Sequence, residues 1–533
     1  MSPRARIAAG WGAVAFAAAL ALSGQPGLPS SEATAMSAGV RTAGWLLAAP
    51  RDLAGSVHGL AALSAERGRP LLAETFHGFA GAGGERAGLG PIRGLRLGSA
   101  LLAGLLSATL AAGAFTLGGA AAALLAPAIF WFTPRTLSLG LLATPDLLGA
   151  LLWLLAMQGF VRALASPTRL ARTRAGLVCG LACAAAAAVR PDLASLWLVL
   201  VVHWGLGRFH LRWLARGDRA EARTEAEVDW AARRRRVPTA IGAGLLLIPA
   251  AMLGFWPAHW SAPLRGGGAL LASIGWGQPP PSVNPALLAL AALPAPTLAL
   301  LALGVGHATL RLVGALRRRE GAVSRLEMLW LLAGTVPLLL AAVGLAPRLP
   351  GIAPVVQALP PLALLGARAL VALGELAWPS RRLAVIGLLS IFLLYPGLRA
   401  AAVTFPHGSS AWGEPLGGAG GAAWRDWPKQ DGGEGVRAVL ANLALHAAPG
   451  ARVRWIGAAP FAIERYRREG LIRSDLLDAA SVDDAELAVV ARDGARDDEY
   501  AAWTAFGSTR AVSGLYLDEV ALVLVYARPG AWR

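Results

Sequence analysis

The stretch of sequence that decides the fold, residues 97–157, reads LGSALLAGLLSATLAAGAFTLGGAAAALLAPAIFWFTPRTLSLGLLATPDLLGALLWLLAM. Arg135 and Asp146 are its only charged residues. A helix that spans a membrane needs about 20 mostly apolar residues, so the stretch is long enough for three spans. Gly118 and Gly119 favour a turn between the first two spans. The three predicted spans are 97–114, 116–133 and 137–157.

Similar apolar runs occur on both sides of this stretch. Hydrophobic residues make up 56% of the 533-residue chain and charged residues 15%, whereas soluble domains carry about 25% charged residues. We therefore predict an α-helical polytopic membrane protein with about eleven spanning helices. The N-terminal run has the form of a signal peptide, which we interpret as an uncleaved first helix. The other predicted spans are 7–23, 174–189, 192–207, 238–256, 286–310, 328–346, 354–374 and 384–403.

The arginines predict how the chain is oriented. They are concentrated in alternate connections between the spans, and the opposite connections carry about one arginine each. This asymmetry places the N-terminus in the cytoplasm and the C-terminus outside. It also accounts for the net charge of +17, so nucleic acid is not an expected partner. The arginine-rich connections are 158–173, 208–237, 311–327 and 375–383.

Two long segments fall on the non-cytoplasmic side. Segment 24–96 is an outer loop whose residues ATAMSAGVRTAGWLLAA have the periodicity of a helix lying along the membrane surface. Residues 405–433 are Gly-rich and resemble a linker. In residues 434–533, apolar strand patterns alternate with helical ones, which predicts a small α/β domain. The predicted division is a membrane domain over 1–404, the linker, and this soluble domain.

Charged residues near the outer ends of the spans are the best candidates for a site, because a charge at membrane depth is costly. Arg135 and Asp146 could face one outward cavity, where an arginine suits a phosphate and a carboxylate suits a metal or a sugar hydroxyl. Asp146 could instead simply begin a helix after Pro145. Arg190 could likewise bind a ligand or pair with Asp192.

Three further residues have both a functional and an ordinary interpretation. Glu32 and Glu66 lie in the first outer loop, where carboxylates are commonly solvated. His259, between two tryptophans, could bind substrate or lie among lipid headgroups. The sequence contains no Walker loop, HExxH, GxSxG or Cys/His zinc spacing, which leaves nucleotide hydrolysis and zinc chemistry without support. The middles of the predicted spans have almost no acids or histidines, which argues against an ion-coupled transporter.

Residues 96–157 resemble the early membrane region of the GT-C glycosyltransferases, the polyprenyl-phosphate-dependent enzymes related to protein O-mannosyltransferases and lipid A aminoarabinose transferase. The shared features are an Arg-led helix, a Gly-rich turn, a helix that ends in Pro and a helix with an outer Asp. WPAHWSAPL resembles the Trp/His loop of the family and LPGIAPVVQALPPLALLGARAL its late helix. The tail resembles the periplasmic domain of bacterial members. The Arg-led helix is RLGSALLAGLL, the Gly-rich turn and the helix that ends in Pro are both in TLGGAAAALLAP, and the helix with the outer Asp is in ATPDLLGALLWLLAM.

This resemblance implies transfer of a sugar from a polyprenyl-phosphate-linked donor to an extracytoplasmic lipid, glycan or protein acceptor, at a bacterial inner membrane. It implies Glu32 as the possible base of the first loop and Asp146 as a second carboxylate that orients the acceptor or a divalent metal. Arg135 and Arg190 become candidates for the phosphate, and Glu66 and His259 for substrate binding. Whether a metal is required stays open, because members of this fold differ.

The sequence departs from the family in the first outer loop. The family has an Asp-Glu pair there, and the matching residues are Ser31 and Glu32, so a serine stands at the position of the usual catalytic base. The family's later Glu-His-Pro-Pro-like element reads ERGRPL here, with Glu66 kept and the histidine lost. Two alternatives therefore remain: a catalytically silent relative that binds or assembles lipid-linked glycans, and a transporter or flippase.

Overall fold

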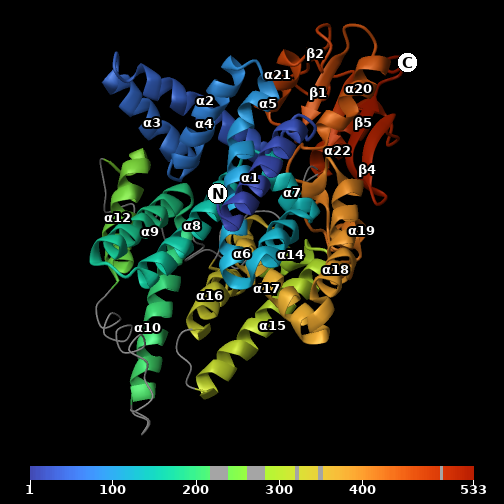
Figure 1. The fold of residues 1–533 in the computed structure, drawn as a ribbon. Coiled ribbons are helices and arrows are strands. Elements are labelled where there is room, and N and C mark those ends of the chain that lie inside the picture. Colours follow the sequence, from blue (N-terminus) through green and yellow to red (C-terminus); the bar gives the residue numbers. More distant parts are fainter. Residues whose placement is uncertain (216–237, 261–282, 319–322, 346–351, 493–495) are drawn as a thin grey trace.

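The computed structural model describes residues 1–215, 238–260, 283–318, 323–345, 352–492 and 496–533. Predictions for 216–237, 261–282, 319–322 and 346–351 lie outside the described residues, including the end of the Trp/His loop. The long apolar helices gather below a second layer made of the first outer loop and the α/β domain (Figure 1). These helices are α1 (Pro3–Leu22), α6 (Leu97–Trp131), α8 (Pro145–Ala165), α9 (Arg169–Val189), α10 (Ser195–Ala215), α12 (Thr239–Phe255), α15 (Ala295–Arg318), α16 (Val323–Ala342), α17 (Leu359–Ala377) and α18 (Arg382–Thr404).

Each of the eleven predicted spans contains helix within the described residues, but the helices differ in how well they suit a membrane. Among the described residues, seven helices are long and apolar enough to cross one. One of them, α6, holds two of the predicted spans. The apolar parts of α10, α12 and α16 are shorter, at 10–17 residues. The protein is thus a multi-pass helical membrane protein, as predicted.

Helix α6 is bent where the sequence predicts a turn. Gly118 and Gly119 have non-helical backbone angles inside its 35 residues, and Gly119 has a φ of 65° that favours glycine. A straight helix of that length would measure about 50 Å, well beyond the roughly 30 Å of a bilayer core. The bend therefore divides α6 into two segments, as the predicted spans 97–114 and 116–133 require.

Two predicted spans are each divided between two helices. The run 137–157 is broken, because the short helix α7 (Pro134–Leu141) ends before α8 begins at Pro145. The run 286–310 is broken in the same way between α14 (Pro285–Ala291) and α15. In both cases a proline follows the break, and the residue before a proline disfavours helical backbone angles.

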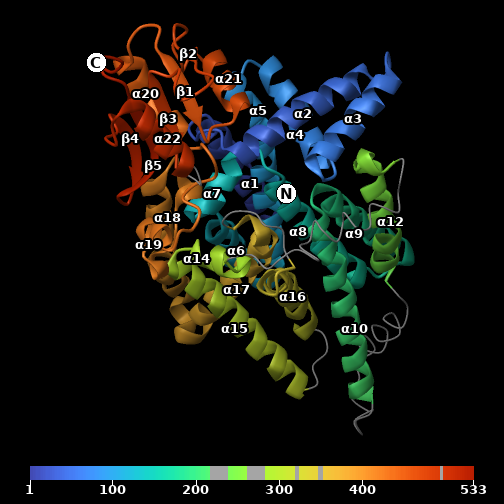
Figure 2. The same ribbon diagram turned by 180° about the vertical axis from the view of Figure 1, so that it is seen from behind.

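The first outer loop is almost entirely helical. Its helices lie beside the α/β domain at one end of the molecule, as both opposite views show (Figures 1 and 2). Helix α2 covers the stretch predicted as a surface helix. The four helices are α2 (Ser30–Ala48), α3 (Leu53–Arg67), α4 (Leu72–Arg86) and α5 (Pro91–Leu95).

The C-terminal domain is a five-stranded sheet with helices on both faces. The strand order is β2-β1-β3-β5-β4, with β1 parallel to β2 and β3, and β5 antiparallel to β3 and β4. One face packs on α20 and α21, and the other on α22. The α/β prediction is confirmed, although β2 and β4 are additional strands. The elements are α20 (Val436–His446), β1 (Arg452–Ile456), α21 (Pro460–Arg468), β2 (Leu477–Asp478), β3 (Leu487–Ala491), α22 (Arg496–Phe506), β4 (Ser513–Leu517) and β5 (Val520–Ala527).

Segment 405–433, which the sequence predicts to be a Gly-rich linker, packs against the membrane helices. Trp412 and Trp427 are buried in the core of the membrane domain, and their ring centroids lie 5.2 Å apart. Their burial fixes the segment across one end of the helices. The short elements here and elsewhere are α19 (Gly418–Trp424), η1 (Pro191–Ala194), η3 (Pro257–His259), η5 (Ala353–Ala358), η6 (Pro379–Arg381), η7 (Gly408–Ser410) and η8 (Glu414–Leu416).

Candidate functional site

A cavity of about 500 Å³ lies where the outer loop, the ends of several membrane helices and segment 405–433 meet. Its charged lining residues come from sequence positions far apart, so that only folding brings them together. Four are arginines and two are aspartates: Arg67, Arg69, Arg135, Arg190, Asp146 and Asp431.

Asp146 and Arg190 form an ion pair at one side of the cavity. Asp146 lies in the first turn of α8, and Arg190 caps the C-terminus of α9. Arg190 Nη1 donates to Asp146 Oδ1 at 2.6 Å and to the carbonyl of Ala353 at 2.8 Å. Its Nε and Nη2 donate to the carboxylate of Asp192 at 3.1 and 2.8 Å. Arg190 thus pairs with Asp192, the ordinary interpretation, and it also fixes Asp146 at the cavity wall.

Arg135 lies at the start of α7, where Thr133 caps the helix. Its Nε donates to the carbonyl of Ala411 at 2.7 Å, and its guanidinium lies over the ring of Trp412 at 4.4 Å. Burial lowers the pKa of Arg135 to about 10, and the charges of Glu434 and Asp431 oppose this shift. The side chain is therefore still a cation at neutral pH. Segment 405–433 holds it in position from outside the membrane helices.

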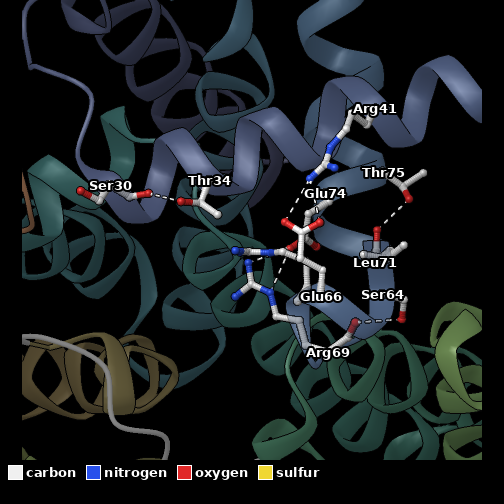
Figure 3. A network of polar contacts seen from close by, with 10 residues as sticks. Ser30, Thr34, Arg41, Ser64, Glu66, Arg69, Leu71, Glu74 and Thr75 are labelled. Carbon is white, nitrogen blue, oxygen red and sulfur yellow. Dashed lines mark hydrogen bonds and ion pairs between the residues drawn. The ribbon is translucent and has the colours of Figure 1, made fainter. Parts of the chain in front are cut away.

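Arg67 and Arg69 reach the cavity from the connection between α3 and α4. Helix α3 ends at Gly68, whose left-handed backbone turns the chain between the two arginines. Arg69 donates through Nε and Nη2 to Oε1 of the buried Glu74, at 2.9 and 2.6 Å (Figure 3). Arg67 lies farther from Glu74, at 3.8 Å, and its buried Nε has no hydrogen-bond partner. Burial, together with the charge of Arg69, lowers the pKa of Arg67, and the charges of Glu74 and Glu66 oppose this shift.

Two hydroxyls in the cavity lining also lack partners among the described residues. They are Ser138 Oγ on α7 and Thr144 Oγ1 before α8, both buried. Buried polar atoms without partners are uncommon in folded proteins. Together with four arginines against two aspartates, these donors make the cavity suited to a polyoxygenated anion such as a phosphate.

The N-terminus of α2 contacts the segment that follows Trp427. Ser30 donates from its backbone and its hydroxyl to the carbonyl of Gly432, at 2.7 and 2.8 Å. Ser31 Oγ donates to Asp431 Oδ2 at 2.5 Å, and both residues line the cavity. The packing is close, since a Cβ at Gly27 would overlap the carbonyl of Glu434. The chain therefore fixes Asp431 beside Ser31.

Glu32, which the family resemblance implies as a possible base, does not line the cavity. Its side chain is 0% exposed and forms a two-pronged ion pair with Arg96, with Nε–Oε1 at 2.8 Å and Nη2–Oε2 at 2.5 Å. The backbone N–H of Ala143 donates to Oε1 at 2.6 Å. One residue along α2 changes the direction of the side chain by about 100°, so Ser31 faces the cavity while Glu32 faces the core.

Glu66 and His259 also lie away from the cavity lining. Glu66 is exposed and pairs with Arg41 of α2 at 3.3 Å (Figure 3). His259 lies in η3 and stacks edge-on against Trp256, with ring centroids 4.6 Å apart. Of the six predicted site residues, the structure thus gathers Arg135, Asp146 and Arg190 in the cavity, and it places Glu32, Glu66 and His259 elsewhere.

Three cavity residues were missed as candidates. Arg67 and Arg69 belong to the ERGRPL element, in which one arginine lies on each side of the turn-forming Gly68. That alternation was an available signal. Asp431 lies in the stretch DGGEG, whose composition is that of a linker. No local pattern distinguishes it from a solvated loop acid.

The cavity is a poor fit to a divalent metal. Within the described ranges, no three His, Cys, Asp or Glu side chains come together as ligands. Asp146 is held by Arg190 and Asp431 by Ser31, and four arginines share the same space. Hard cations prefer several oxygen ligands without competing positive charge.

A second, apolar groove of about 170 Å³ lies on the other side of α7, against α1 and α18. Leu137, Gly140 and Leu141 of α7 face this groove, whereas Arg135 and Ser138 face the polar cavity. Helix α7 therefore separates a charged compartment from one lined by Trp11, Val14, Leu22 and other apolar residues.

This chain resembles known proteins in structure but not in sequence. No protein-family model matches it, and no curated protein matches it in sequence. The crystal structure of ArnT from Cupriavidus metallidurans bound to undecaprenyl phosphate superimposes with a TM-score of 0.52 at 15% identity, covering 97% of this chain and 98% of ArnT. An oligosaccharyltransferase from Archaeoglobus fulgidus gives a TM-score of 0.46 at 12% identity, over 74% of this chain and 56% of the enzyme. Both neighbours are GT-C glycosyltransferases, and the ArnT match confirms the predicted fold.

Proposed function

We propose that this protein transfers a sugar from a polyprenyl-phosphate-linked donor to an acceptor on the extracytoplasmic side of a bacterial inner membrane. The observation that carries the proposal is the cavity in which four arginines and Asp146 converge. The match to ArnT, whose structure holds undecaprenyl phosphate, supports a lipid-linked phosphate as the ligand. The apolar groove beside α7 supports a lipid chain on the donor.

In this proposal the arginines bind the donor phosphate. The cavity concentrates positive charge where the bond to phosphate breaks and negative charge develops, and such charge stabilisation commonly supplies a large share of catalysis. Arg67 and Arg135 are the better candidates, because the nitrogens of Arg190 already have partners in Asp146, Asp192 and Ala353. Asp146 orients the acceptor through its carboxylate. Arg190 holds that carboxylate in place.

One observation favours a second function. Ser31 faces the cavity where the related enzymes carry their usual base, and the neighbouring Glu32 is closed off in an ion pair with Arg96. A protein that binds lipid-linked glycan without transferring its sugar would tolerate this arrangement. Binding of polyprenyl phosphate is common to both functions, so only a transfer assay separates them.

The test is sugar transfer by purified protein in lipid nanodiscs. The protein is incubated with a panel of radiolabelled undecaprenyl-phosphate-linked sugars, and a bacterial cell-envelope fraction serves as the acceptor. We expect label to leave the lipid and enter the envelope fraction. Asp146→Asn should reduce this rate by about 10²-fold, the order of magnitude for a reacting group that is misplaced by roughly 1 Å. Bound donor with no transfer by the unaltered protein would support the silent binding function instead.

Binding is measured separately with undecaprenyl phosphate alone, by the shift in melting temperature. Arg67→Gln should weaken binding by about tenfold or more, because a hydrogen bond to a charged group contributes about 1.5–3 kcal/mol. Arg41→Gln is the matched control, since Arg41 is exposed and its partner Glu66 lies outside the cavity lining. Equal binding by the two variants would contradict the assignment of the phosphate to this cavity.

A further inference from the structure

We propose that Asp431 supplies the general base that the first outer loop lacks. This inference rests on the proposed sugar transfer and names a residue for it. The first loop presents Ser31 to the cavity, and a serine hydroxyl is too weak a base to accept a proton from an acceptor. Asp431, from a segment 400 residues away, accepts the Ser31 hydrogen bond at 2.5 Å and lines the same cavity.

Close packing fixes this arrangement on both sides. The two hydrogen bonds from Ser30 to Gly432 bind the segment to the start of α2. A Cβ at Gly432 would come within 2.6 Å of Ser30 Oγ, and Gly433 has a φ of 79°. Buried Trp427 secures the segment upstream. Asp431 is therefore placed as firmly as a residue of the outer loop itself.

The other acids near this point are less suitable. Glu32 and Glu434 are both 0% exposed, and neither lines the cavity. Burial raises the pKa of Glu434 well above its ordinary value, and the charge of Asp431 adds to the shift, so Glu434 resists ionisation. Asp146 lines the cavity, but Arg190 holds it at 2.6 Å. Asp431 is partly exposed and reaches the cavity together with Ser31.

The reaction balances with this assignment. The acceptor hydroxyl or amine gives its proton to the Asp431 carboxylate as its lone pair forms a bond to the anomeric carbon of the sugar. The bond between that carbon and the phosphate oxygen breaks, and its electron pair leaves with the polyprenyl phosphate, opposite the charges of Arg67 and Arg135. The proton then passes from Asp431 to water.

The experiment compares single variants with a relocation of the carboxylate. Asp431→Asn should lower the turnover rate by about 10²–10⁴-fold and abolish the loss of activity toward acidic pH, because that loss reports protonation of the base. The double variant Ser31→Asp with Asp431→Asn should turn over at least about tenfold faster than Asp431→Asn alone. The reason is that a carboxylate would again reach the cavity, from the adjoining position. Asp426→Asn, exposed and outside the cavity lining, is the control.

The outcomes separate this inference from the proposed function. If the unaltered protein transfers sugar and Asp431→Asn keeps its rate and pH profile, Asp431 is not the base. A double variant no faster than Asp431→Asn, with an unchanged melting temperature, would equally overturn the inference. If the unaltered protein transfers no sugar from any donor of the panel, the proposed function itself fails.

Discussion

Two ion pairs close to the cavity, Glu32–Arg96 and Asp146–Arg190, show how similar charges come to differ in role. In the first pair both side chains are 0% exposed, and Arg96 also donates to the carbonyls of Ser23, Pro26 and Gly27. In the second pair both residues line the cavity. The first pair holds the start of the outer loop against α6, whereas the second places a carboxylate in the wall of the cavity.

The difference arises from where the partners of each arginine lie, since Asp146 and Ala353 line the cavity and none of the partners of Arg96 does. Arg96 directs all its donors into the loop 23–27 and to Glu32, which leaves a closed network with no opening to a ligand. A fully satisfied buried network rigidifies its surroundings. An acid close to a candidate motif in sequence can therefore be purely structural, even when it is one residue from a position that faces the cavity.

The largest expected effect on stability comes from breaking the fully buried ion pair of Glu32 and Arg96. Glu32→Gln leaves the Arg96 charge buried without its carboxylate, and removal of one partner from a buried pair costs about 3–5 kcal/mol. We expect a marked fall in melting temperature in detergent, whereas Asp146→Asn should cost much less because Arg190 retains Asp192. A Glu32→Gln protein that is as stable as the unaltered one but inactive would instead restore Glu32 as a catalytic residue.

The second-largest effect is a pH dependence of stability that comes from His77, which contacts the backbone just before Asp146. His77 Nε2 lies 3.2 Å from the carbonyl of Thr144, directly before α8, and burial lowers the pKa of His77 to about 4. Between pH 6.5 and 4 the unfolded chain therefore binds a proton that the folded chain does not. Stability should fall by roughly 3 kcal/mol as the pH drops through this window. His77→Gln should remove that part of the dependence in denaturation measured at pH 7 and pH 4, and an unchanged dependence would contradict the assignment.

The smallest effect concerns the exposed pair of Glu66 and Arg41. Their side chains are 58% and 43% exposed, and exposed pairs contribute about 0–1 kcal/mol. Glu66→Gln should therefore leave the melting temperature within about 2 °C and the transfer rate nearly unchanged. A loss of transfer similar to that of Asp146→Asn would show that Glu66 takes part in the site. The distinction between acids that line the cavity and acids that do not would then fail.

The sequence by itself determined the membrane class, the bend at Gly118 and Gly119 and the α/β character of the C-terminal domain, because each follows from local hydrophobicity and backbone preference. It also nominated Arg135, Asp146 and Arg190, since charges within apolar runs are rare and costly. Only the tertiary structure decided which acids face the cavity. Glu32 and Ser31 are neighbours that point in different directions, and Asp431 reaches Ser31 across 400 residues. Such placements depend on the packing of distant segments, which no local pattern encodes.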